Sequence, residues 1–247
     1  MANCKLSLAM LVVLLFAHSA TADEWARFRG PNGTGVAPPL DIPNSWSESD
    51  FAWQAGLPGV GHSSPVVSGD QVYITAGDER TGAVHLEAYD VETGKRAWRQ
   101  SVEASARGMN NLNAYASTTP AVDDKHVYLT YYNPGSVTLV AYTHAGNEVW
   151  RRDLGDFTGE HGFSVSPIVV GDLVCLQNDD NDGGCLMALD VMTGDERWRV
   201  ERSAGKHAYS TPATMRMPDG TLAIIFTSKA TGITAVDAKT GAQLWQQ

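Results

Sequence analysis

The side chains with the richest chemistry in this chain stand just before four regularly spaced prolines. They are His62, Ser63, Tyr115, His161, His207 and Tyr209. If the four segments end at one opening, the set predicts a ligand-binding face, because convergent polar and aromatic groups are typical of such sites. The alternative is that these residues cap strand ends and pack between neighbouring units. Both interpretations stay open for the set, whereas packing is the better one for any single histidine.

A metal centre built from the three histidines is not predicted. A zinc or similar site needs several ligands at bonding distance from one centre. His62, His161 and His207 precede their prolines by three, six and five residues, so equivalent units would place them differently.

The stretch 178–183 (Asn-Asp-Asp-Asn-Asp-Gly) resembles the first half of a calcium loop. The twelfth position of such a loop should carry a bidentate carboxylate, and here it is Leu189. We therefore interpret the stretch as a hairpin turn. Because the chain also lacks the Gly-x-Ser-x-Gly, His-Glu-x-x-His and phosphate-loop motifs, we predict no catalytic residue.

These residues belong to a unit that the chain repeats four times. Each unit opens with a Ser/Thr-Pro pair and closes with a tryptophan. The prolines, which lie 55, 47 and 45 residues apart, are Pro65, Pro120, Pro167 and Pro212. The tryptophans, which lie 52, 48 and 47 residues apart, are Trp98, Trp150, Trp198 and Trp245. A period of this length indicates a repeat architecture.

Each unit predicts four short antiparallel strands. Its apolar runs have strand length and are separated by Gly, Asp, Asn and Pro. A turn before the last run suits a hairpin in which glycine takes positive φ, and these glycines are Gly94, Gly146, Gly194 and Gly241. One such sheet cannot cover its own two faces, so the units must stack about an axis with the tryptophans between them. The sequence therefore predicts an all-β propeller with four blades, at about residues 63–98, 117–150, 164–198 and 209–245.

The motif Ala-x-Asp-x-x-Thr-Gly-x-x-x-Trp, at 88–98, 188–198 and 235–245, resembles the pyrroloquinoline-quinone (PQQ) repeat. The second copy, which begins at Ala141, lacks the Asp and is one residue shorter. Together with Trp25–Gly33, the chain after residue 22 resembles secreted PQQ-like propellers related to the outer-membrane assembly factor BamB. The resemblance implies a non-enzymatic scaffold that binds a protein or another ligand.

The alternative that this resemblance implies is a PQQ- and calcium-dependent quinoprotein dehydrogenase. Quinoprotein alcohol dehydrogenases carry a disulfide between adjacent cysteines, whereas Cys175 and Cys185 are ten residues apart. The three PQQ carboxylates need a basic clamp, for which the chain offers only the scattered residues Arg107, Lys206 and Lys229. We therefore expect no resident cofactor and no metal.

The first part of the chain predicts export. Residues 1–22 combine Lys5, an apolar run and an Ala-Thr-Ala cleavage site, which is typical of a secretory signal peptide. Residues 23–50 are rich in Pro, Gly and Asn, and we expect an arm that packs through Trp25, Phe28 and Trp46. The signal predicts a periplasmic or extracellular protein.

Residues 51–54, with Trp53, look like a fifth blade-ending strand without the three strands that should precede it. The chain thus has five strands of the kind that ends a blade, but only four sets of the three strands that precede it. This count predicts a ring that is not closed within 247 residues. We interpret the chain as a C-terminally truncated member of its family. The alternative is a closed four-blade ring in which the Trp53 strand is left over.

The net charge of the chain narrows the classes of partner that it can bind. The formal net charge of −10 argues against a nucleic-acid backbone or an anionic lipid surface. A protein, peptide or polysaccharide of the cell envelope remains as the expected partner.

Cys175 and Cys185 flank the hairpin turn on adjacent strands, so a cross-strand disulfide is an alternative to the expected buried thiols.

Overall fold

The computed structural model describes residues 24–31, 33–39, 41–103, 113–133, 135–159 and 161–247. The predicted signal segment 1–22 and Arg107 lie outside these residues. The described chain holds one 3₁₀ turn, Glu48–Asp50, and four four-stranded sheets.

Each sheet is an antiparallel meander in which the strands neighbour one another in chain order. Blade A consists of β1 (Val66–Ser68), β2 (Gln71–Gly77), β3 (Val84–Asp90) and β4 (Arg96–Val102). Blade B consists of β5 (Ala121–Val122), β6 (His126–Asn133), β7 (Gly135–Thr143) and β8 (Glu148–Phe157). Blade C consists of β9 (Ile168–Val170), β10 (Leu173–Asp180), β11 (Gly183–Asp190) and β12 (Glu196–Arg202). Blade D consists of β13 (Ala213–Arg216), β14 (Leu222–Ser228), β15 (Gly232–Asp237) and β16 (Gln243–Gln246).

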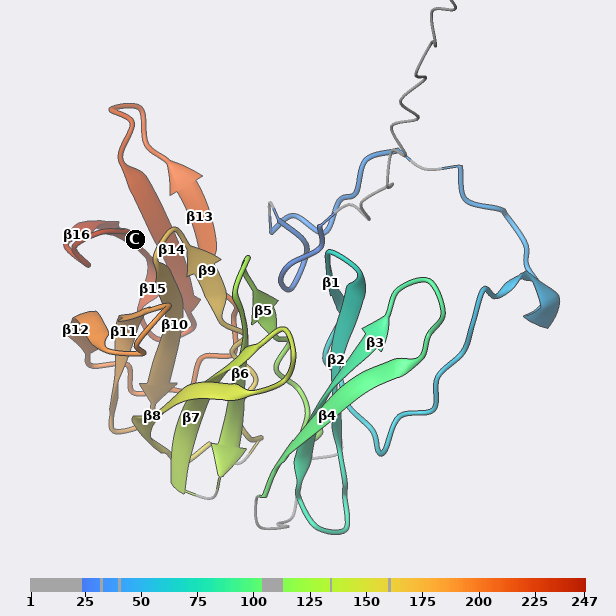
Figure 1. Cartoon of the computed structure of the whole chain (residues 1–247). Coiled ribbons are helices and arrows are strands. Elements are labelled where there is room, and N and C mark those ends of the chain that lie inside the picture. The colour runs from blue at the N-terminus through green and yellow to red at the C-terminus, as the bar shows by residue number, and fades with distance from the viewer. Residues whose placement is uncertain (1–23, 32, 40, 104–112, 134, 160) are drawn as a thin grey trace, which may run out of the picture.

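The four blades follow one another along an arc, and the predicted all-β propeller architecture is confirmed (Figure 1). The short first strands lie on the inner side, next to the blue N-terminal segment. Each blade ends with the strand that carries its tryptophan. Strands β4, β8 and β12 continue for several residues past this tryptophan, and β16 ends one residue beyond it. The Asn178–Gly183 stretch contains a two-residue hairpin turn, Asn181-Asp182, as predicted, because Asp180 pairs with Gly183.

The apolar core lies between the blades. One buried cluster joins blades A and B, a second joins B and C, and a third joins C and D. The largest fully buried side chains include Tyr73, Tyr128 and Phe226. Burial of both faces explains why β10 is buried at every position instead of alternating with solvent.

The closing tryptophans of blades A, B and C each pack on the glycine turn of the next blade. Trp150 of blade B lies over Gly194 of blade C, where an added Cβ would come within 2.6 Å of the indole ring. Gly194 also has φ +70°, so only glycine suits both the turn and the contact. The indole N–H of Trp150 donates to Val191 O at 3.0 Å. The same contact recurs for Trp98 on Gly146 and Trp198 on Gly241.

Polar side chains on the second strands form a further link between blades. Thr75 donates to Thr118 O of blade B at 3.2 Å, and Thr130 donates to Val165 O of blade C at 3.0 Å. Gln177 takes the same place in blade C and donates to Ser210 O at 3.0 Å. These bonds fix the start of each inner strand relative to the preceding blade.

Two predictions about the N-terminal part need correction. Residues 51–54 do not form a strand, because no described strand lies beside them to complete a ladder. Trp53 still packs on Gly94 and donates to Val91 O at 2.9 Å, as the closing tryptophans do. Trp46 is 64% exposed, so the expectation that it packs on the propeller is wrong.

Replacing Trp150 by Ala should lower the free energy of unfolding by about 3–5 kcal/mol, because it removes a buried ring between two blades. Trp245→Ala is the matched control, because Trp245 is half-buried and no described blade follows it. We expect it to cost less than half as much. Chemical denaturation followed by tryptophan fluorescence measures both, and equal losses would contradict the inter-blade role.

The turn carboxylates should make the fold sensitive to acid. Hydrogen bonds lower the pKa of Asp90 (from the Thr93 side chain), Asp190 (from the Met192 N–H) and Asp237 (from the Thr240 side chain). Their stabilisation is therefore full above the unfolded-state pKa and is lost as pH falls below about 4. Changing all three to Asn should flatten the fall in unfolding midpoint between pH 5 and about pH 2.

The control for this measurement is a chain with three exposed acids outside the turns changed in the same way. These are Asp41, Glu48 and Asp124. Blade B has Thr143 in place of the Asp, and its hydroxyl accepts the Asn147 N–H at 3.1 Å without a titrating group. Identical acid profiles for the two triple variants would contradict the prediction.

Candidate ligand-binding site

The inner strand starts of all four blades border one cavity of about 420 Å³ near the propeller axis. Blade and inter-blade segments contribute His62, Ser117, Thr119, Ser164, Ser166, Tyr209, Ser210, Thr211, Pro212, Ala213 and Thr227. The first part of the predicted arm, described residues 24–31 and 33–35, contributes Phe28, Arg29 and Gly33, and from here on we call this part the N-terminal arm. We call this space the axial cavity. Hydroxyl groups dominate its wall because each blade begins with a Ser/Thr-Pro pair.

Two of these hydroxyls are held in place by the blade-to-blade contacts. Thr119 Oγ1 accepts the Ser64 N–H at 2.9 Å, and Ser166 Oγ accepts the Thr119 N–H at 2.9 Å. Both side chains are almost fully buried. A hydroxyl that accepts in this way keeps its own hydrogen to donate. The repeat thus aligns hydrogen-bond donors along the axis.

The predicted face residues divide into two groups. His161, His207 and Tyr209 lie together, with the Tyr209 ring centroid 6.3 Å from each imidazole centroid. We call these three the top-face cluster. Tyr209 is 37% exposed and lines the axial cavity together with His62. It also borders two smaller cavities, one with Asn113, His161 and Ser164, and one with His207.

Ser63 and Tyr115 make contacts of another kind. The Ser63 hydroxyl donates to Thr75 O at 3.2 Å, and the His62 N–H donates to Ala116 O at 2.9 Å. Tyr115 is half-buried and packs on the core between blades A and B. For these two residues, the contacts are those of the capping and packing alternative.

His207 contacts both an acidic and an aromatic side chain. Its Nε2 lies 2.6 Å from Asp180 Oδ1, and its ring packs on Phe157 with centroids 5.1 Å apart. Burial of Asp180 acts to raise its pKa, but hydrogen bonds from Thr158 and Asn181 outweigh this and lower the pKa. The ionised Asp180 therefore lies beside the His207 ring at the edge of the cluster.

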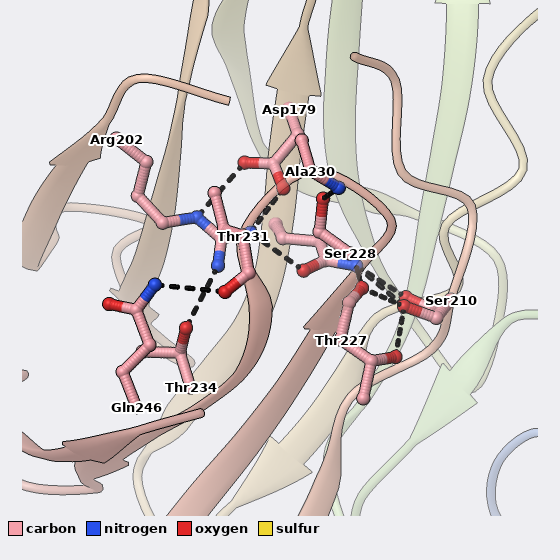
Figure 2. Close-up of polar contacts among 10 residues, drawn as sticks. Asp179, Arg202, Ser210, Thr227, Ser228, Ala230, Thr231, Thr234 and Gln246 are labelled. Atoms are coloured by element: carbon pink, nitrogen blue, oxygen red, sulfur yellow. Dashed lines mark hydrogen bonds and ion pairs between the residues drawn. The ribbon is translucent and has the colours of Figure 1, made fainter. Parts of the chain in front are cut away.

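A polar network holds the part of blade D that borders the axial cavity (Figure 2). Arg202 pairs with the buried Asp179 and donates to Thr234 of blade D at 3.3 Å. At the cavity side, the Ser210 hydroxyl donates to Thr227 O, and Thr227 Oγ1 lies 2.8 Å from Ser210 Oγ. The segment that carries Tyr209 is thereby tied to β14.

The sequence did not predict that the N-terminal arm borders the axial cavity. Trp25 pairs with Val67 of β1, and the Val122 N–H of β5 donates to Ala26 O at 2.8 Å. Arg27 is buried and reaches across to blade D, where its Nη1 lies 3.4 Å from Pro212 O. Figure 1 shows the arm between blades A and D. The Arg-Phe-Arg-Gly sequence was the available signal, but no repeat pattern places it at the axis.

The two cysteines do not form a disulfide, so that alternative is wrong. Both are free and buried. Cys175 belongs to the core between blades C and D, whereas Cys185 belongs to the core between B and C. Cys185 pairs across the ladder with Asn178, three residues from Cys175, so the two thiols point to opposite faces. Burial raises the pKa of Cys185 to about 12 and that of Cys175 further.

Two further findings concern metals and membranes. Among the described residues, no group of three or more His, Cys, Asp or Glu side chains is arranged to hold a metal ion. None of the described segments is an apolar helix of membrane-spanning length.

Four-stranded meanders locked in series by tryptophan-on-glycine contacts define a β-propeller repeat protein. The model of the PQQ-repeat family described as outer membrane protein assembly factor BamB matches residues 47–131 and 83–247. The chain therefore belongs to this family.

Similarity to individual proteins supports the assignment to this family. The chain is 26% identical over 239 residues to outer membrane protein assembly factor BamB of Burkholderia pseudomallei, covering 95% of this chain. It spans 53% of that relative, about half its length. The structure of BamB from Moraxella catarrhalis is similar with a TM-score of 0.50 and 22% identity, over 79% of this chain and 51% of that one.

A second solved structure shares the fold. The quinohemoprotein alcohol dehydrogenase from Comamonas testosteroni gives a TM-score of 0.67 with 17% identity, over 94% of this chain and 42% of that one. At this identity the likeness concerns the propeller architecture alone.

Alkylation should distinguish free thiols from a disulfide. We expect Cys175 and Cys185 to resist iodoacetamide in the native protein, because both are buried and their raised pKa values disfavour the thiolate. After unfolding without reductant, both should be alkylated, as peptide mass spectrometry would show. A peptide pair that reacts only after reduction would contradict the structure.

Proposed function

We propose that this protein is a non-enzymatic binding scaffold of the cell envelope, which presents the top-face cluster to a protein partner. The observation that carries the proposal is the gathering of His161, His207 and Tyr209 from two inter-blade segments beside three cavities. A partly exposed tyrosine flanked by imidazoles is suited to a protein contact, because aromatic residues supply area and hydrogen bonds at interfaces.

Family membership supports the same proposal. The relative from Burkholderia pseudomallei is described as an outer membrane protein assembly factor, and we extend a role of that kind to this chain. The predicted signal peptide 1–22 supports periplasmic or extracellular localisation. The scaffold is proposed to work without PQQ, calcium or another cofactor.

The partner should be captured from the top face and not from the outer rim. A photo-cross-linking residue in place of Tyr209 should give a discrete adduct in the cell envelope, because its side chain is at the face. The same residue in place of Val149 is the matched control, because Val149 is 41% exposed and lies on the outermost strand β8. The adduct should weaken when His161 is also changed to Ala.

Adducts are read by immunoblot and identified by mass spectrometry. Equal adducts from both positions, or none from Tyr209, would contradict the proposed face. An adduct from Tyr209 that His161→Ala leaves unchanged would remove the histidine from the binding surface.

A further inference from the structure

The axial cavity differs in charge from the rest of the molecule. The chain carries a net charge of −10. The described residues that line the cavity include Arg29 and His62 but neither Asp nor Glu. A cleft that lacks acids and holds a guanidinium attracts anions even when the protein around it is acidic.

The N-terminal arm holds Arg29 at the cavity by a strained backbone. Arg29 has φ 64°, the one positive value among the described residues other than glycine. The Gly35 N–H donates to Arg29 O at 2.9 Å, and the Arg29 guanidinium lies 5.3 Å from the centre of the Phe28 ring. Left-handed backbone at a bulky residue persists where the surrounding structure enforces it, and such residues gather at binding sites.

A second arginine adds positive charge behind the cavity wall. Arg27 is 6% exposed and donates to two backbone carbonyls, of Gly30 at 3.2 Å and of Pro212 at 3.4 Å. Among the described residues, no carboxylate lies within ion-pair distance of it. Burial lowers the pKa of Arg27, which is the signature of an uncompensated charge. Pro212 itself lines the cavity, so an anion there would offset this cost.

Donors and rings complete the site. Thr119 and Ser166 accept N–H groups from the preceding blade, so their hydroxyl hydrogens remain to donate to a ligand. Phe28 and Tyr209 supply ring faces in the lining. A volume of about 420 Å³ suits a small ligand. Abundant hydroxyls match a polyhydroxylated ligand better than an apolar one.

We propose that the axial cavity binds an acidic sugar, a pyranose ring that carries one carboxylate. The carboxylate pairs with the Arg29 guanidinium, whose planar fork matches carboxylate geometry. The ring hydroxyls exchange hydrogen bonds with Thr119, Ser166 and their neighbours, and the apolar face of the sugar packs on Phe28 or Tyr209. This assignment goes beyond the proposed partner-binding function and does not depend on it.

Isothermal titration of the full chain with glucuronate, glucose, acetate, inorganic phosphate and PQQ with calcium tests the proposal. We expect glucuronate to bind at least about tenfold more tightly than glucose or acetate, because charged hydrogen bonds and hydroxyl contacts both contribute. Arg29→Gln should weaken glucuronate by about 10- to 100-fold and leave the weak glucose signal unchanged.

Two further variants keep the test independent of folding. Arg216→Gln makes the same charge change on the exposed strand β13, away from the lining, and should bind as the parent does. Arg29→Gly suits the positive φ, so it should keep or raise the melting temperature while it loses glucuronate binding. The cross-link from position 209 should persist in Arg29→Gln, which separates this site from the partner surface.

Each contrary result is decisive. No glucuronate binding, or equal binding by the Arg29→Gln and Arg216→Gln variants, overturns the proposal. Acetate or phosphate that matches glucuronate overturns the sugar assignment and leaves an anion site. PQQ binding that depends on Arg29 overturns it in favour of a quinone.

Discussion

A β-sheet with two apolar faces must be covered on both sides, and this constraint determines the rest of the structure. Blades B and C each contribute faces to two separate cores, and blades A and D each contribute to one, so no blade is a closed unit by itself. The tryptophan-on-glycine contact gives this packing a direction, because at each junction the earlier blade supplies the ring and the later one supplies the turn. A chain of such contacts sets both the order of the blades and their orientation about the axis.

The hydrogen bonds between blades turn this packing into a defined inner wall. Thr75, Thr130 and Gln177 each reach the segment before the next blade's first strand. These segments carry the Ser/Thr-Pro pairs, so the contacts that join the blades also align the hydroxyls of the axial cavity. The same short segments therefore have both structural and binding roles. His207 is an example, because it packs on Phe157 and also belongs to the top-face cluster.

The periodic part of the fold could be predicted from the sequence, because tryptophan, glycine and proline recur at positions that a blade requires. The predicted face was less determined, since spacing from a proline does not decide what a side chain contacts: it does not distinguish Tyr115, which packs on the core between blades A and B, from Tyr209, which lines the axial cavity. The cysteine alternative failed because ladder register decides which face a thiol occupies. An arm that packs through Trp25 and Phe28 was predicted, but its place at the axial cavity was not, because its partners there are non-local and follow no repeat.

The contact between Arg27 and Pro212 O has a consequence for the order of assembly. The two residues are 185 positions apart, so the arm leaves the ribosome or export channel long before its last partner exists. Blades A and B can pair with Trp25 and Ala26 early, since those contacts are closer in sequence. The wall of the axial cavity is therefore completed only after the fourth blade has emerged.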